Sequence, residues 1–227
     1  MAREKVFPTP EAALADVPSG AVILVAGFGG VGRPEGLLRA LRENGAVDLT
    51  LVYAHGVWEV PAGTVDGVTE LVASGRVRKL ISPLPFPPGR GGIVERLHRE
   101  GQLEIEVIPQ GILAERLRAG GAGLGGVFLP DAGGTRFAVG RESREIDGQP
   151  VTLEWPLRAD FALIKARAGD RLGNLVYAGT DRNWGPVMAM SAGVTIAEVS
   201  ELLEPGDLDP ELVITPGIFV NRIVRGG

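Results

Sequence analysis

The stretch Ala26-Gly27-Phe28-Gly29-Gly30-Val31-Gly32-Arg33-Pro34-Glu35 decides the fold, because it joins a short apolar run to an amphipathic segment. Residues 21–25 are continuously apolar, which is typical of a parallel strand covered on both faces. Residues 34–44 carry an apolar stripe formed by Leu37, Leu38 and Leu41. Glycines allow positive φ angles, and the free amides at a helix N-terminus attract anions. The sequence therefore predicts a strand, a glycine turn that acts as an anion cradle, and a helix.

The alternation of strand-like and helix-like segments continues through the first half of the chain. The strand-like segments are 49–54, 77–81 and 103–108, and the helix-like segments are 65–73 and 93–100. This alternation predicts an α/β fold, with an open, mainly parallel sheet, helices on both faces, and ligands at the carboxyl ends of the strands. The glycine turn follows such an end.

Three further segments complete the interpretation of the first half. Thr9-Pro10-Glu11 is typical of a helix start, with residues 12–17 as the body of the helix. A later helix is expected over 111–118, running into a flexible glycine-rich loop over 119–123. The 227 residues suffice for one domain, so we expect a single domain over 1–227.

The final third is expected to be richer in β structure. A polar hairpin over 142–155 should turn at Asp147-Gly148. The remaining expected elements are strands at 161–167 and 174–177 around a turn at 169–173, a helix at 186–192, a strand at 194–199, a turn at 205–210 and a mostly extended tail.

Composition excludes several classes of function. A net charge of −5 and a pI near 5.2 disfavour a nucleic-acid partner, which would need clustered Lys and Arg. No apolar run approaches the roughly 20 residues that cross a bilayer, and the charged start at residues 1–5 precedes no signal-type apolar core, so we expect no membrane partner and a cytoplasmic location. The chain has no cysteine, and His55 and His98 are its two histidines, so we expect no metal site.

The glycine turn fits neither of the common nucleotide-binding patterns. No Lys-Ser or Lys-Thr pair follows it, as a phosphate loop requires. The next strand ends in Tyr53-Ala54-His55-Gly56 and lacks the acidic residue of a dinucleotide site. From the residues alone, the turn predicts an anion site whose ligand stays open.

Several blocks in order along the chain carry a resemblance to a known family. Residues 22–35 resemble the glycine-rich signature of the alpha subunit of family I coenzyme A transferases, such as 3-oxoacid CoA-transferase. The further matching blocks are 109–123, 160–166, 188–190 and 216–220. The resemblance thus covers nearly the whole chain.

The resemblance implies covalent catalysis with coenzyme A as a substrate and no tightly bound cofactor. In this family a glutamate attacks an acyl-CoA, forms a mixed anhydride and becomes a glutamyl-CoA thioester. That glutamate lies in a Ser-Glu-Asn-Gly motif of the beta subunit, and the sequence Ser-Glu-Asn-Gly does not occur here. The chain is therefore expected to supply half of an active site and to form a heterotetramer with its partner, the beta subunit.

The resemblance also assigns roles to particular residues. Gln110 is expected to stabilise the developing oxyanion, with capping of a helix that begins at Gly111 as the structural alternative. The residues expected to face CoA or the acyl group are Ala26, Gly27, Phe28, Gly29, Gly30, Val31 and Gly32, together with Ala54, His55 and Gly56 at the next strand end.

Other charged residues receive structural interpretations. Glu35 lies in the first turn of a helix, where it is expected to interact with the helix dipole rather than act as a nucleophile. His55, at a strand end, is either a pocket residue or a hydrogen-bonded structural residue. His98 and residues 116–118 are expected to be solvated.

Two segments depart from the family pattern, and both follow strands. Relatives typically carry Asn-Asn where this chain has Ala54-His55. Residues 82–90, which include four prolines, are more apolar and rigid than the usual Ser-Tyr-Val-Gly-Glu-Asn run. These departures suggest a different acyl substrate.

The preferred hypothesis is an alpha subunit that uses a short acyl-CoA, such as succinyl-CoA or acetyl-CoA, and a 3-oxo or related acid. Two alternatives remain open at this point. One is a sugar-phosphate isomerase of related architecture that uses an acid of this chain as its base. The other is a non-catalytic assembly subunit.

Overall fold

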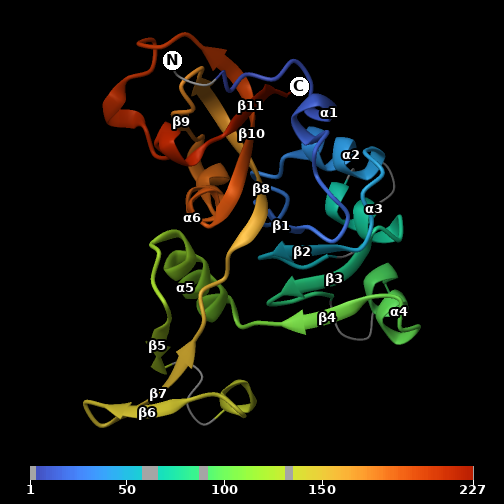
Figure 1. Ribbon diagram of the computed structural model, residues 1–227, viewed down its shortest axis with the longest axis vertical. Helices are drawn as coiled ribbons and strands as arrows, with labels where there is room; N and C mark the ends of the chain where they lie inside the picture. Colours follow the sequence, from blue (N-terminus) through green and yellow to red (C-terminus); the bar gives the residue numbers. More distant parts are fainter. Residues whose placement is uncertain (1–3, 58–65, 87–91, 131–134, 227) are drawn as a thin grey trace.

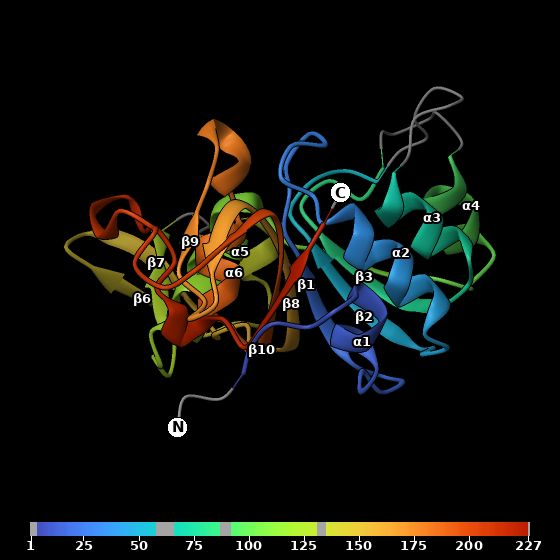
Figure 2. The ribbon, with the colours of Figure 1, turned by 90° about the horizontal axis from the view of Figure 1, so that it is seen from above.

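The computed structural model describes residues 4–57, 66–86, 92–130 and 135–226, and over these residues the chain forms an eight-stranded sheet with helices on both faces (Figures 1 and 2). The main strands in spatial order are β11 (Arg222–Arg225), β10 (Ala192–Leu203), β8 (Ala159–Asp170), β1 (Val22–Val25), β2 (Leu49–Tyr53), β3 (Val77–Ser82) and β4 (Glu104–Val107). Neighbours in this order are parallel, and β9 (Leu175–Val176) pairs antiparallel with β8. The predicted mainly parallel α/β fold is confirmed.

Two groups of helices cover the two faces of the sheet (Figure 2). One face carries α1 (Pro10–Leu14), α2 (Glu35–Glu43), α3 (Gly67–Ala73) and α4 (Ile93–Arg99), and the other carries α5 (Gln110–Gly121) and α6 (Gly185–Met190). Side chains alternate along β1, so Ile23 and Val25 join the first core and Leu24 joins the second. Burial on both faces explains why the central strands are continuously apolar.

The strand order reverses direction at β1. β2 lies on one side of β1 and β8 on the other, with Val25 opposite Tyr53 and Leu163 respectively. The chain leaves β1 toward α2 on one face, and after β8 it forms α6 on the other face. In open α/β sheets, ligands bind outside the carboxyl ends of the strands at such a switch point. The glycine turn lies at this point.

A second sheet projects from the body of the molecule (Figure 1). It consists of β5 (Val127–Leu129), β7 (Gln149–Glu154) and β6 (Ser143–Ile146), paired antiparallel. The predicted turn at its hairpin is confirmed, since Asp147 and Gly148 have φ angles of 51° and 73°. β5 was not predicted, because three residues leave no readable periodicity.

Other boundaries differ from the expected ones. α1 ends at Leu14 rather than at residue 17, β8 and β10 are longer than expected, and the tail contains β11. The predicted loop at 119–123 is wrong in part, because α5 continues through Gly121. A Cβ on Gly120 would collide with the Leu157 carbonyl oxygen, and one on Gly121 would lie 2.6 Å from Met190 Cβ. These glycines therefore permit close packing of a helix rather than loop flexibility.

Parts of two expected segments lie outside the described residues. They are residue 65 of the helix expected over 65–73 and residues 87–90 of the proline-rich segment. Within the described part of the chain, no helix is both long enough and apolar enough to span a membrane.

Candidate functional site

The glycine turn is a miniature hairpin that follows β1. Phe28 and Val31 exchange two backbone hydrogen bonds of 3.0 Å, and Gly29 and Gly30 form the exposed tip with φ angles of 61° and 88°. Gly32, at the base, has a φ of 75°, and a Cβ there would lie 2.5 Å from the Asp181 carbonyl oxygen. The tip glycines thus serve the turn geometry, whereas Gly32 also serves packing.

Gly27, at the other side of the base, is buried with a φ of 119°, and a Cβ would collide with the Arg33 side chain. The preceding Ala26 is 1% exposed and donates its amide to the Leu163 carbonyl oxygen at 3.0 Å. The predicted contact residues therefore divide into a buried base and an exposed tip. Phe28 and Val31, 42% and 43% exposed, are the side chains that the tip presents to a ligand.

The amides at the start of α2 already hold an anion, which corrects the predicted cradle. Pro34 is the N-cap of α2 rather than part of its first turn. The Glu198 carboxylate, on β10 and 3% exposed, accepts the Leu37 amide at 2.9 Å and also the Gly36 amide. Burial raises the pKa of Glu198, while these two amides and the charge of Lys165 oppose the rise. The helix N-terminus is therefore filled from within the chain.

A buried arginine fixes the base of the turn to its neighbours. Arg33 is 9% exposed; its Nε donates to Glu35 Oε1 at 2.6 Å and an Nη lies 3.1 Å from Asp66 Oδ1. Burial acts to lower the pKa of Arg33, but Asp66 and Glu35 together raise it, so the guanidinium remains charged. Glu35 Oε2 also accepts the Gly67 amide at 3.0 Å. Glu35 is thus a structural residue.

The end of β2 brings an imidazole against the turn. The ring centroids of Phe28 and His55 are 4.7 Å apart and tilted by 55°, and Tyr53 meets His55 edge-on at 6.3 Å. Burial lowers the pKa of His55, and the Arg33 charge lowers it further against the opposing effect of Asp66. The half-buried imidazole is therefore neutral at pH 7.

His55 is flanked by two buried residues, Ala54 with 0% exposure and Gly56. Of the three predicted contact residues after β2, His55 is therefore the one whose side chain lies at the surface. Ser82, the last residue of β3, donates its hydroxyl to the His55 carbonyl oxygen at 3.1 Å. The backbone at His55 is thus held by the neighbouring strand.

Gln110 lies at the same edge of the sheet but farther along it. It is exposed and begins α5, after β4. The N-cap is Pro109 and no side chain caps the helix, so the capping alternative for Gln110 is wrong. β2 and β3 separate β4 from β1, which places Gln110 about 14 Å along the edge from the turn at the usual strand spacing.

One segment shares three of four residues with the nucleophile motif of the partner subunit. Arg42-Glu43-Asn44-Gly45 ends α2, with Asn44 as the C-cap and Gly45 at a φ of 90°. The Asn44 Oδ1 accepts the Ala46 amide at 2.9 Å. A helix of nine residues is about 13 Å long, so this segment lies at the end of α2 remote from the turn. It forms a helix stop.

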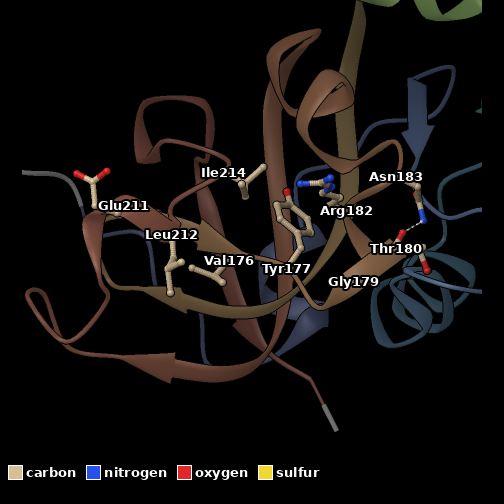
Figure 3. Close-up of a pocket in the computed structure, with 9 residues that line it drawn as sticks. All are labelled: Val176, Tyr177, Gly179, Thr180, Arg182, Asn183, Glu211, Leu212 and Ile214. Carbon is tan, nitrogen blue, oxygen red and sulfur yellow. Dashed lines mark hydrogen bonds between the residues drawn. The ribbon is translucent and has the colours of Figure 1, made fainter.

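A cavity of about 650 Å³ lies behind the glycine turn (Figure 3). Val176, Leu212 and Ile214 form its apolar floor, with Arg182 and Tyr177 above them. Its volume falls within the roughly 300–1,000 Å³ of small-molecule sites. The cavity and the turn share a wall, because Asn183 donates its side-chain amide to the Val31 and Thr180 carbonyl oxygens at 3.0 and 2.9 Å.

The remaining charged predictions have mixed outcomes. His98 is exposed, as expected, with Nδ1 3.0 Å from the Leu103 carbonyl oxygen. Arg118 is exposed, but the prediction for Arg116 is wrong. Arg116 is partly buried and donates its Nε to the Trp155 carbonyl oxygen at 2.9 Å. No cluster of three or more potential metal ligands occurs among the described residues.

The site also contains residues that were not predicted, namely Arg33, Asp66, Tyr53, Asn183 and Glu198. A charged residue directly after four glycines was a visible signal for Arg33. Glu198 gave no local signal, because its partner Leu37 is 161 residues away.

The open parallel sheet with a glycine turn at its switch point is the fold and site of a coenzyme A transferase. The model of the coenzyme A transferase family matches residues 7–226, and the chain belongs to this family. The expected kinship with the alpha subunits, which some relatives designate by the letter A, is confirmed. The chain is 45% identical to the A-type subunit of the 3-oxoadipate CoA-transferase of Pseudomonas putida, over 97% of this chain and 93% of that protein.

Two further comparisons support this assignment. The chain is 44% identical to the A-type subunit of the succinyl-CoA:3-ketoacid coenzyme A transferase of Xanthomonas campestris pv. campestris, over 97% of this chain and 88% of that protein. It superimposes with a TM-score of 0.80 on the acyl-CoA transferase of Escherichia coli O157:H7 in a thioester complex with CoA, at 19% identity. That match covers 99% of this chain and 48% of the other, so this chain spans about half of that protein.

Proposed function

We propose that this chain is the alpha subunit of a heteromeric CoA-transferase that exchanges CoA between a short acyl-CoA and a 3-oxo or related carboxylic acid. Succinyl-CoA and acetyl-CoA are the preferred donors. The names of the relatives, which belong to transferases for 3-oxoadipate and 3-ketoacids, support this substrate class. The proposal includes a single α-subunit domain over 1–227, a cytoplasmic location and no tightly bound cofactor.

One observation supports the need for a partner: the carboxylates built around the turn are all engaged. Glu35 binds Arg33 and Gly67, Asp66 binds Arg33 and caps α3, and Glu198 binds the start of α2. A nucleophilic carboxylate must reach the thioester carbonyl unhindered. None of these three meets that requirement, so the glutamate comes from the beta subunit.

The reaction then proceeds by two exchanges on the partner's glutamate. Its carboxylate attacks the acyl-CoA carbonyl and expels the CoA thiolate, leaving a mixed anhydride. The thiolate attacks the glutamyl carbonyl and releases the first acid, which gives the glutamyl-CoA thioester. The second acid attacks this thioester by the same steps in reverse order, so bonds and charges balance without another reactant.

This chain contributes binding and oxyanion stabilisation to those steps. Residues 26–32, with Phe28 stacked on His55, form the wall that faces the acyl group, and Ala54 and Gly56 hold His55 in place. Gln110 supplies an exposed amide donor that no helix cap consumes. A single well-placed donor of this kind stabilises the transition state by about 3–4 kcal/mol in acyl-transfer enzymes.

The two alternatives fare differently. An isomerase would need a base from this chain, and the three carboxylates around the turn are all hydrogen-bonded or ion-paired. That engagement disfavours the isomerase. A non-catalytic assembly subunit is separated from the proposal by experiment.

The test is co-purification with the beta subunit, followed by incubation with succinyl-CoA and hydroxylamine or borohydride. We expect a trapped glutamyl adduct on the beta subunit in the complex, dependent on both chains. No adduct across a panel of acyl-CoAs would support an assembly role. Sugar-phosphate isomerisation by the isolated chain would support the isomerase.

A further inference from the structure

We propose that Glu198 is a positioning residue for the transferase reaction: its carboxylate is a built-in anion that fixes the start of α2 and thereby the glycine turn. The inference rests on the proposed function. Glu198 touches neither turn nor substrate, and it acts through the two backbone amides that it binds.

The chain leaves a fitted space for this carboxylate. A Cβ on Gly36 would lie 2.9 Å from Glu198 Oε2, and a Cβ on Gly226 would lie 2.5 Å from Glu198 Cγ and 2.7 Å from Oε1. Gly226 is held there by its amide, which donates to the Val199 carbonyl oxygen at 2.8 Å. Glycines from α2 and from the end of the chain thus enclose one side chain from β10.

The position of Glu198 makes it a brace across the switch point. β8 lies between β10, which carries Glu198, and β1, which leads into the turn. The hydrogen bond from Leu37 to Glu198 therefore ties the start of α2 across β8. Because Arg33 and Pro34 connect the turn directly to α2, an orientation fixed at Leu37 is passed back to the turn.

Charge supports the same arrangement. The positive end of the α2 dipole favours an anion at this position. Lys165, half-buried on β8, is the cross-strand neighbour of Glu198 in the parallel register. Glu35, the other charged group that acts on Glu198, is neutralised by Arg33. A substrate anion is thus excluded from the α2 amides and left to the tip of the turn.

Replacing the carboxylate with an external one tests the inference. In the αβ complex, Glu198→Gly opens the space and frees both amides. We expect at least a tenfold loss of kcat at a temperature where the variant is fully folded, with a much smaller change in KM for acyl-CoA. Formate, added against chloride at equal ionic strength, should bind in the space, raise Tm and restore turnover with one half-saturating concentration.

Two further variants keep the test sharp. Glu201→Gly, on the exposed part of the same strand, should lose little activity and gain nothing from formate. Glu198→Gln keeps the shape but opposes an NH2 group to one amide, so it should lose kcat without formate rescue. It also provides a folded variant if Glu198→Gly does not fold.

The outcomes separate the inference from the proposed function. Wild-type kcat in folded Glu198→Gly or Glu198→Gln overturns the positioning role, as does a formate-dependent Tm without formate-dependent turnover. Absence of any formate effect on the Tm of folded Glu198→Gly overturns the built-in anion. If the wild-type complex transfers no CoA, the proposed function and the positioning role fail together, and the formate effect on Tm still decides whether Glu198 fills the site.

Discussion

Arg33 combines the two demands on a residue at the base of a functional turn, since it must be charged and yet almost wholly buried. Its guanidinium lies between Glu35 and Asp66, whose side chains are 34% and 4% exposed. Removing one partner of a buried pair leaves the other charge without compensation. The two carboxylates thus make the site dependent on this arginine.

Arg33→Met should therefore destabilise the chain by about 3 kcal/mol, the lower end of the range for breaking a buried ion pair. Urea unfolding measures the change. Arg42→Met is the matched control, because Arg42 pairs with Glu70 on the same helix face but both side chains are substantially exposed. The control should cost less than about 1 kcal/mol, and equal losses would contradict the account.

Both tyrosines of the chain, Tyr53 and Tyr177, should resist ionisation at pH 10. Burial raises the pKa of each, that of Tyr177 to about 12 although its hydroxyl bonds Thr215. The folded chain then holds more protons than the unfolded chain above pH 10, so stability falls as pH rises through that window. Absorbance titration of the phenolate should show no step near pH 10 before unfolding, and Tyr177→Phe should reduce the alkaline loss of stability.

Gln110→Ala tests the proposed oxyanion donor. We expect a fall in kcat of about 10²–10³-fold, the effect of losing one such donor. Tm should stay unchanged, because Gln110 is exposed and caps no helix. Gln102→Ala, another exposed glutamine, is the control. Undiminished turnover in the Gln110→Ala complex would remove Gln110 from the mechanism.

At the scale of elements, α5 shows a glycine acting against its usual preference. Alanine is normally the better helix former by about 1 kcal/mol. At Gly120, however, a Cβ would collide with the Leu157 backbone, so Gly120→Ala should destabilise the chain by about 1–3 kcal/mol. Thermal unfolding measures this, with Gly125→Ala, where a Cβ meets open space, as the near-neutral control. A stabilised Gly120→Ala would show that the two segments can separate at no cost.

The elements also show what sequence reasoning can reach. The strand, turn and helix around Gly27 were predicted because their signals are local: an apolar run, four glycines and an amphipathic stripe. The end of α5 was mispredicted because glycines signal a loop unless the neighbouring backbone at Leu157 is known. Glu198 escaped for a stronger reason, since its role depends on Leu37 and Gly226, which no periodicity relates to it.

At the scale of the whole molecule, the two ends of the described chain hold each other. Phe7 donates its amide to the Ile223 carbonyl oxygen and Ile223 donates to that of Lys5, both at 2.8 Å. The Arg222 guanidinium bonds the Ala13 carbonyl oxygen at 2.6 Å and the Asp16 carboxylate at 2.5 and 2.6 Å. β11 is therefore secured by the start of the chain.

Arg222→Met should loosen this closure and cost about 1.5–3 kcal/mol, the range for hydrogen bonds to a charged group. Hydrogen exchange should show faster exchange at the amides of Phe7 and Ile223, with little change at Leu24 in the centre of the sheet. Arg225→Met, on the exposed end of the same strand, is the control. Uniform acceleration across the sheet would instead mean that the ends have no separate stability.

The central position of β1 has a consequence for biosynthesis. Its Val22 amide bonds the Asp160 carboxylate, a residue 138 positions later in the chain. At the 5–20 residues per second of translation, the ribosome needs about 7–28 s to make that distance. During this interval the nascent chain presents an apolar strand with one unpaired edge, a known starting point for aggregation. Chaperone supply during translation, more than the stability of the finished sheet, should therefore limit the yield of this protein.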